Sequence, residues 1–359
     1  MKNVAVIMAG GKGERFWPMS TKEYPKQFLR LTDSSLTMIQ LTVERIKKLV
    51  DLEDIYIITN RKYEDIMIKQ LKSIPKENII FEPVSKNTAP CIGLASAIIK
   101  KKYGDANVIV LSSDHAISNN ILFLSSLTLA INHAEKGNII TLGIVPTRIE
   151  TGYGYIKLGD KLKGNDSIYK VEKFYEKPSY TLAKEYYDSK EFLWNSGIFV
   201  WKNSTIYQAF KVYMPELFSS ILALENSVGH KDFYDVLECE FNKLESNSID
   251  YGIMEKAKNI MVVPGSFGWD DVGSWLSVER LRNSDENNNI LEGKIIEYNS
   301  TNNIMFNQED KKLLAVSGVE NLVIINTEKS LLIIDKDKVP EIKELIKKIK
   351  EDKECERFL

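Results

Sequence analysis

The chain has 359 residues, with 48 Lys and Arg against 50 Asp and Glu, so its formal net charge is −2. This near balance argues against a nucleic-acid-binding scaffold, which would carry a large basic excess. Three scattered cysteines exclude a disulfide framework, and no apolar run reaches the ~18–20 residues of a membrane span. The first residues lack the pattern of a secretory signal. We therefore expect a cytoplasmic enzyme of about two domains that binds neither nucleic acid nor membrane.

The N-terminal half alternates short apolar runs with helical patterns. The expected strands are Val4–Met8, Ile55–Thr59, Ile79–Phe81, Val108–Ser112 and Ile139–Gly143. The expected helices run from an N-cap at Ser35 to Val50, from Arg61 to Lys72, from an N-cap at Asn87 to Lys102, and over Ile121–Glu135. Strands that are apolar along their length, separated by helices, indicate a parallel sheet covered on both faces. Such sheets bind ligands beyond the carboxyl ends of their strands.

The pattern is less regular from about Thr151 to Ala257, where Tyr169–Tyr175 and Gly197–Trp201 resemble strands. The polar segment Arg282–Asn289 is typical of a linker because it carries a cluster of Ser, Asn and Asp. It predicts one domain over residues 1–281 and a second over residues 290–359.

The second domain contains short β-like runs followed by a helix. The runs are Lys294–Tyr298, Asn303–Phe306, Leu313–Ser317, Leu322–Asn326 and Leu331–Asp335. Pro340 suits the first turn of the closing helix, in which Ile342, Leu345, Ile346 and Ile349 form one apolar stripe. That stripe must pack either on this chain or on a partner subunit.

A glycine loop, Ala9–Pro18 (AGGKGERFWP), follows the first strand directly. Glycines let backbone N–H groups approach an anion closely, and Lys12 and Arg15 place two cations in the same turn. A tight connection with solvated charges is the alternative interpretation. The loop is not a dinucleotide fingerprint, because Phe16 takes the position of the third glycine, and it lacks the Gly-Lys-Ser/Thr of a P-loop.

A second motif, Pro25–Phe28 (PKQF), follows seven residues later and presents Lys26 from a proline-fixed turn. Together the two motifs resemble the pyrophosphorylase signature of sugar nucleotidyltransferases, and their Phe-Trp-Pro and Lys-Gln-Phe variants resemble the mannose-1-phosphate guanylyltransferase branch. The resemblance implies a Rossmann-like, GT-A-like α/β domain with a mostly parallel sheet flanked by helices. It also implies a small C-terminal β module, similar to a left-handed β-helix, with a terminal helix.

Two acidic segments lie far apart in the sequence. Asp114 ends the fourth predicted strand, where a carboxylate is well placed to hold Mg²⁺, although a turn or N-cap aspartate is an alternative. In Trp269–Gly273 the family spacing Trp-x-Asp-x-Gly falls on Asp271, and Asp270 is the less favoured candidate. A β-turn with an acidic tip is the alternative there. The resemblance implies that Asp114 and Asp271 bind the metal cofactor, Mg²⁺.

The resemblance also assigns substrate contacts. Residues implied to bind the nucleotide are Ala9, Gly10, Gly11, Lys12, Gly13, Glu82, Asn87, Thr88 and Ala89. Residues implied to bind the sugar phosphate are Gly154, Glu176, Lys177, Asn195 and Asp250. Without the family, simple helix capping explains Asn87, a solvated pair explains Glu176 and Lys177, and a turn explains Asn195.

The implied reaction joins GTP and mannose 1-phosphate to give GDP-mannose and pyrophosphate, with Arg15, Lys26, Asp114 and Asp271 as catalytic residues. One alternative is a sibling enzyme that uses another sugar 1-phosphate or nucleotide, such as glucose 1-phosphate with UTP or dTTP. Another is a non-catalytic regulatory paralogue. By analogy with the family we expect a homodimer. We expect no isomerase activity, because no histidine follows His230.

Overall fold

The computed structural model describes residues 1–11, 13–162 and 167–359. They form two compact units, each assembled from several segments of the chain. Unit 1 comprises Met1–Gly10, Val43–Ser113 and Ile117–Trp269, and unit 2 comprises Gly11–Thr42, Asp114–Ala116 and Asp270–Leu359. The compact units therefore do not follow the order of the sequence, and the division into domains 1–281 and 290–359 stays a prediction.

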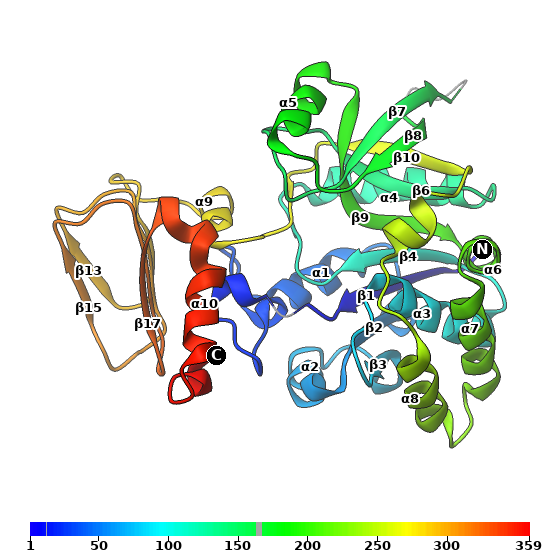
Figure 1. Cartoon of the computed structure of the whole chain (residues 1–359), viewed down its shortest axis with the longest axis horizontal. Coiled ribbons are helices and arrows are strands. Elements are labelled where there is room, and N and C mark those ends of the chain that lie inside the picture. The colour runs from blue at the N-terminus through cyan, green and yellow to red at the C-terminus, as the bar shows by residue number, and fades with distance from the viewer. Residues whose placement is uncertain (12, 163–166) are drawn as a thin grey trace. The chain divides into compact units, whose positions relative to one another are not determined.

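Unit 1 contains a mixed sheet with helices packed against it (Figure 1). Its strands are β1 (Asn3–Ala9), β2 (Ile55–Asn60), β3 (Ile79–Glu82), β4 (Asn107–Ser112), β6 (Ile139–Ile144), β7 (Tyr155–Lys161), β8 (Tyr169–Tyr175), β9 (Phe192–Lys202) and β10 (Ile260–Gly265). Its helices are α2 (Glu64–Gln70), α3 (Thr88–Tyr103), α4 (Asn120–Ala134), α5 (Tyr180–Ser189), α6 (Asn203–Tyr213), α7 (Pro215–Ser227) and α8 (Phe233–Lys243). The helix α1 (Met38–Ile46) and the short strands β5 (Ala116–Ile117) and β11 (Trp269–Asp270) lie where the chain passes from one unit to the other.

The strand order in the described part of this sheet is β3-β2-β1-β4-β9-β6-β10-β8-β7. The predicted α/β fold is confirmed, and β1 to β4 pair in parallel, for example with Val6 opposite both Tyr56 and Val110. The other half of the sheet is mixed, because β10 pairs in parallel with β6 while the remaining pairings are antiparallel. There β9 runs antiparallel to both β4 and β6, and β7 and β8 form an antiparallel pair. The sequence indicated β8 and the end of β9 but not β7, and it did not indicate the strand directions. Antiparallel strands need no crossover helix between them, so the alternation of strands and helices is lost in this region.

The core of unit 1 lies between the sheet and a group of helices, α3, α6, α7 and α8, which Figure 1 shows beside β1 to β4. Val4 and Val6 point to this face because alternate residues of a strand share one side. They pack with Leu94, Phe210 and Phe241 from the helices. This apolar layer fixes the strands whose carboxyl ends carry several predicted site residues.

The helix starts show one correct prediction and one error. Asn87 caps α3, since its side chain accepts a hydrogen bond from Thr88 N. Ser35 does not cap α1, which begins at Met38. There the side chain of Gln40 accepts a hydrogen bond from Thr37 N at 3.0 Å. A glutamine inside the first turn thus satisfies the backbone N–H of the residue just before the helix.

Unit 2 contains short strands stacked as the rungs of a β-helix. They are β12 (Ile290–Glu292), β13 (Ile295–Tyr298), β14 (Ile304–Asn307), β15 (Leu314–Ser317), β16 (Leu322–Asn326) and β17 (Leu331–Asp335), followed by α10 (Ile342–Glu351), with α9 (Val278–Leu281) before them. β12, β14 and β16 pair in parallel, β13 pairs in parallel with β15, and β17 closes the stack antiparallel to β16.

Buried asparagines hold the corners of these rungs together. Asn289 Oδ1 accepts hydrogen bonds from both Asn303 N and Asn303 Nδ2 at 3.0 Å. Asn303 Oδ1 accepts in turn from Leu322 N at 2.9 Å. Because each buried amide has backbone or amide partners, polar residues that are typical of turns in the sequence are stable inside the module.

The core of unit 2 joins the N-terminal glycine-loop region to the C-terminal module. The ring centroid of Trp275 lies 5.1 Å from that of Phe16 and 5.4 Å from that of Phe306. Ile342 and Ile346 of α10 belong to the same core, so the apolar stripe of the terminal helix packs on its own chain. Among the helices of the described residues, none combines the length and apolarity that a membrane crossing needs.

Candidate active site

Lys26 is the centre of a cluster of predicted catalytic residues in unit 2. It begins a short 3-10 helix after Pro25 and is only 6% exposed. Its ammonium nitrogen lies 2.8 Å from Asp114 Oδ2 and donates to the backbone oxygen of Asp271 at 2.6 Å. A buried ammonium needs such partners, since desolvation penalises an unpaired charge. Three segments far apart in the sequence thus meet at one side chain.

Arg15 reaches the same turn as Lys26. Its side chain is exposed, and Nη1 donates to Gly273 O at 3.3 Å. Val272 between these contacts has a φ of 50°, a left-handed conformation that an L-residue with a branched side chain rarely adopts. The turn 271–273 therefore presents its carbonyl groups to both cations.

The structure separates the roles of the two neighbouring aspartates. Asp270 is buried, accepts a hydrogen bond from Val272 N at 2.8 Å and forms an ion pair with Arg280 at 2.6 Å. Its carboxylate is thus committed to holding the turn. Asp271 is half-buried, and its carboxylate lies over Gly273, where a Cβ would come within 2.8 Å of Oδ2.

The glycine loop contains two different kinds of glycine, while the predicted ligand Lys12 lies outside the described residues. Gly13 has a φ of 62°, and a Cβ there would meet Lys26 Cβ at 2.3 Å. Gly10 and Gly11 are exposed, and a Cβ on either would meet no atom of the described residues within 4 Å. Gly13 therefore serves the packing of Lys26, whereas Gly10 and Gly11 leave open space beside the backbone.

The donor atoms of unit 2 fit a hard divalent cation. The described residues contain no group of three or more His, Cys, Asp or Glu side chains able to hold a metal. Mg²⁺ commonly takes only one or two carboxylates and fills its other positions with water and phosphate oxygens. Asp114 and Asp271 would supply these two carboxylates. The Asp114 carboxylate also forms an ion pair with Lys26.

The predicted base-binding residues lie in unit 1, at the end of β3 and the start of α3. Ala9, also predicted to bind the nucleotide, ends β1, and its backbone oxygen accepts a hydrogen bond from the Thr59 hydroxyl at 3.0 Å. Glu82 is 4% exposed, and its Oε1 has no hydrogen-bond partner among the described residues. Burial raises the pKa of Glu82 to about 7, and a hydrogen bond with Cys91 opposes the shift. Glu82 is therefore a buried carboxyl group with one oxygen that the described residues leave without a hydrogen bond.

The backbone amides at the start of α3 are partly occupied. Asn87 takes the amide of Thr88, and Ala89 N donates to Asn247 O at 3.1 Å. Thr88 Oγ1 accepts from Ile249 N at 2.8 Å. Asn247 thus uses one of the backbone donors at this helix end. No local pattern indicates that partner, because Asn247 lies about 160 residues away in an irregular segment.

The predicted sugar-binding residues form a second cluster in unit 1. Asn195 Nδ2 donates to Asp250 Oδ1 at 2.8 Å, and Asn195 N donates to Gly154 O at 2.8 Å. A Cβ on Gly154 would lie 3.1 Å from Glu176 Oε2, an atom that is buried with no partner among the described residues. Lys177 follows with an exposed side chain and a φ of 41°.

The two carboxyl groups of this cluster are poorly solvated. Burial, and then the nearby Asp250 carboxylate, raise the pKa of Glu176. Burial also raises the pKa of Asp250, and the hydrogen bond from Asn195 opposes that shift. A ligand with hydroxyl donors would stabilise the ionised form of such carboxyl groups, because its hydrogen bonds replace the lost hydration.

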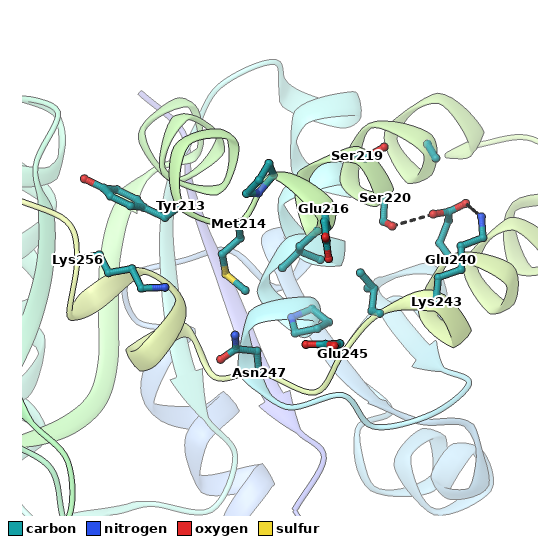
Figure 2. Close-up of a pocket in the computed structure, with 15 residues that line it drawn as sticks. Tyr213, Met214, Glu216, Ser219, Ser220, Glu240, Lys243, Glu245, Asn247 and Lys256 are labelled. Carbon is teal, nitrogen blue, oxygen red and sulfur yellow. Dashed lines mark hydrogen bonds and ion pairs between the residues drawn. The ribbon is translucent and has the colours of Figure 1, made fainter.

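A separate pocket of about 670 Å³ lies in unit 1 among α6, α7 and α8 (Figure 2). Figure 2 shows Ser220 and Lys243 both bonded to Glu240, with Lys256 on the opposite side. Of the predicted site residues that the structure describes, none lines it, although Pro90 and Asn247 do. It borders the start of α3 without including the predicted base-binding groups.

Comparison with known proteins decides the family. The family model described as nucleotidyl transferase matches residues 4–288, and the model of a mannose phosphate isomerase/GMP-like β-helix domain matches residues 293–349. A mannose-1-phosphate guanylyltransferase from Salmonella muenchen is 40% identical over 97% of this chain and 74% of its own length. The chain belongs to the mannose-1-phosphate guanylyltransferase family. It spans about three quarters of the length of such relatives.

Two further relatives of this enzyme agree. The mannose-1-phosphate guanylyltransferase RfbM of Salmonella typhimurium is 39% identical over 98% of the chain and 73% of its own length. A crystal structure from Thermus thermophilus, described as a mannose-1-phosphate geranyltransferase, is 33% identical with a TM-score of 0.87, covering 98% of this chain and 100% of that one. The resemblance inferred from the glycine loop and PKQF is thereby confirmed at the level of the family.

The two kinds of glycine yield a matched pair of variants. We expect Gly13→Ala to destabilise the enzyme by about 2 kcal/mol or more, because the new methyl group collides with Lys26 and the φ is unfavourable. Gly11→Ala has room in the fold, so its melting temperature should stay within about 2 °C of wild type. Thermal unfolding measures both. Equal destabilisation by the two variants would contradict this interpretation of the loop.

Glu82 should make stability depend on pH. Its folded pKa, about 7, lies above its ordinary value of 4.5. The buried protonated form is therefore favoured at low pH, and stability is lost as the pH rises from about 4.5, the ordinary pKa, to about 7, the folded pKa. We expect the stability advantage of Glu82→Gln over wild type to grow between pH 5 and pH 8, by up to about 3 kcal/mol.

Denaturant unfolding at both pH values measures this difference, because all other titrating groups are shared by the two proteins. Glu77→Gln, at an exposed position just before β3, is the matched control and should show no such growth. A Glu82→Gln difference that is the same at pH 5 and pH 8 would show that this carboxyl group titrates normally.

Proposed function

We propose that this enzyme transfers GMP from GTP to α-D-mannose 1-phosphate, giving GDP-mannose and pyrophosphate. The observation that carries the proposal is the meeting of Lys26, Asp114 and Asp271 in unit 2 of a chain that belongs to this family. Relatives named mannose-1-phosphate guanylyltransferase support the choice of GTP and mannose 1-phosphate as substrates.

The proposed chemistry is an in-line displacement at the α-phosphorus. A phosphate oxygen of the sugar phosphate forms the new bond, and the bond from the α-phosphorus to the bridging oxygen breaks, so that pyrophosphate leaves with the electron pair. No strong general base is needed, because a phosphate monoester with a second pKa of ~6 is largely ionised at neutral pH. Catalysis then consists of positioning and charge neutralisation.

Unit 2 supplies the groups proposed for the phosphates. Lys26 would attract the α-phosphate and the nucleophile, while Arg15 and the amides of Gly11, Lys12 and Gly13 would hold the departing pyrophosphate. Asp114 and Asp271 would hold a divalent metal, which we propose to be Mg²⁺ and which supplies charge neutralisation when bound. The pairing of Lys26 with Asp114 supports this assignment, since it places a carboxylate next to the lysine proposed for the α-phosphate.

Unit 1 supplies the groups proposed for the base, ribose and sugar. Glu82, with Asn87, Thr88, Ala89, Ala9 and Gly10, would contact the nucleoside. Gly154, Glu176, Asn195 and Asp250 would bind the sugar, and the exposed Lys177 would hold its phosphate. The unpartnered oxygens of Glu82 and Glu176 support these roles, because both can accept hydrogen bonds from a ligand. A homodimer and a cytoplasmic location are further parts of the proposal.

The neighbouring aspartates give a direct test of the mechanism. We expect Asp271→Asn to lower kcat by roughly 10²–10³-fold with little loss of stability, because it removes one of the two carboxylates proposed to hold the divalent metal. Asp270→Asn should instead cost about 1–3 kcal/mol of stability, since it breaks the ion pair with Arg280. Pyrophosphate release and thermal unfolding measure the two effects. Full turnover of Asp271→Asn would remove that residue from the mechanism.

Substrate choice is tested by comparing substrate pairs. The enzyme is incubated with GTP, UTP, dTTP and ATP in turn, each with mannose 1-phosphate or glucose 1-phosphate, and the products are identified by mass. We expect GDP-mannose as the main product, by roughly tenfold or more over any other pair, because a wrong base leaves buried polar groups unpaired. A better yield with UTP or dTTP would identify a sibling enzyme instead.

A further inference from the structure

Arg148 makes an unusual set of contacts in the segment between β6 and β7. Its Nη2 donates to the Tyr153 hydroxyl at 3.1 Å and to Glu150 Oε2 at 3.3 Å. The guanidinium carbon lies 5.1 Å from the Trp194 ring centroid and 5.7 Å from that of Tyr153. The side chain is one-third exposed, and its guanidinium lies within cation–π distance of both rings while Nη2 forms hydrogen bonds.

Glu150 links Arg148 to the backbone of the loop that follows. While its Oε2 pairs with Arg148, its Oε1 accepts from Gly152 N at 2.9 Å. Its backbone oxygen accepts from the Tyr155 hydroxyl at 2.9 Å. The segment from Arg148 to Tyr155 is therefore closed on itself, and Arg148 supplies the positive charge in this network.

Trp194 connects the same guanidinium to strand β9. It is 1% exposed, pairs with Tyr155 of β7, and its ring meets that of Tyr153 with centroids 5.2 Å apart. The next residue, Asn195, donates its backbone N–H to Gly154 O. Arg148 thus touches both the loop and the strand that the Gly154–Asn195 hydrogen bond joins.

We propose that Arg148 is a positioning residue for the sugar phosphate, an inference that rests on the proposed function. By holding the 148–155 loop on Trp194, it fixes the position of Gly154 next to Glu176 and that of Asn195 next to Asp250. Its own hydrogen bonds go to Glu150 and Tyr153, and not to the residues proposed to bind the sugar. It acts on them through the loop, because Tyr153 directly precedes Gly154. Lysine cannot replace it fully, because an ammonium lacks the planar fork of N–H donors.

The test compares Arg148→Met and Arg148→Lys with wild type, with GTP and mannose 1-phosphate varied separately. We expect Arg148→Met to raise KM for mannose 1-phosphate roughly 5–20-fold and to leave KM for GTP within about twofold. Arg148→Lys should raise it by a smaller factor, roughly 2–5-fold, because it keeps the charge but loses the planar set of N–H donors. Arg61→Met is the matched control, since that guanidinium also lies over an aromatic ring, 4.9 Å from the centroid of Tyr234, and should change neither KM.

A second readout distinguishes positioning from general destabilisation. Hydrogen exchange of the amides of residues 149–154 should become faster in Arg148→Met, while β1 and β4 keep wild-type protection. Glu150→Gln should raise the same KM, and the double variant should raise it less than the product of the two single effects.

The outcomes separate the two proposals. An active wild type whose Arg148→Met variant shows unchanged KM values, or an equal rise for both substrates, overturns the inference and leaves the proposed function standing. A wild type that makes no GDP-mannose overturns the proposed function and the inference with it. If Arg148→Met does not fold, Arg148→Lys and Glu150→Gln carry the same test.

Discussion

The interaction on which the candidate site depends is the buried ion pair between Lys26 and Asp114. A buried ammonium is stable only with close partners, so Lys26 draws both a carboxylate and the carbonyl of Asp271 to itself. The backbone at Gly13 must be free of a side chain to allow that approach. Three segments spread over most of the chain are thereby fixed around one positive charge, and Arg15 joins them through the turn at Gly273. The same charge is what a phosphate-transferring enzyme needs at its centre.

The C-terminal module contributes to this arrangement through shared packing. Trp275 lies between Phe16 of the glycine-loop segment and Phe306 of the β-helix, and its indole N–H donates to Trp17 O at 3.2 Å. Trp17 in turn donates to Phe358 O at 2.9 Å. Aromatic pairs of this kind bury large areas and prefer defined orientations. The module therefore supports the loop that carries Arg15, in addition to any role in assembly.

Unit 1 contains two carboxyl groups with buried oxygens that lower its stability at the residues predicted to bind substrate. Glu82 and Glu176 each bury a carboxyl oxygen that has no partner among the described residues, and burial raises the pKa of both groups. Buried polar atoms are usually satisfied, so at these two residues the fold leaves hydrogen-bonding capacity unused. Asn195 and Gly154 hold the surrounding backbone in place.

The sequence by itself determined the α/β class, the first strands, the cap at Asn87 and the family, because these depend on local periodicity and short contiguous motifs. It also named Asp114 and Asp271, but only through their resemblance to family motifs. Tertiary structure alone decided that Asp270 is held by Arg280, that β9 runs antiparallel within the sheet, and that the Arg148 guanidinium lies over the ring of Trp194. Each of these rests on contacts between residues that no local spacing relates. A charged side chain looks the same in sequence whether it meets solvent, a buried partner or a ring, and only the folded chain determines which.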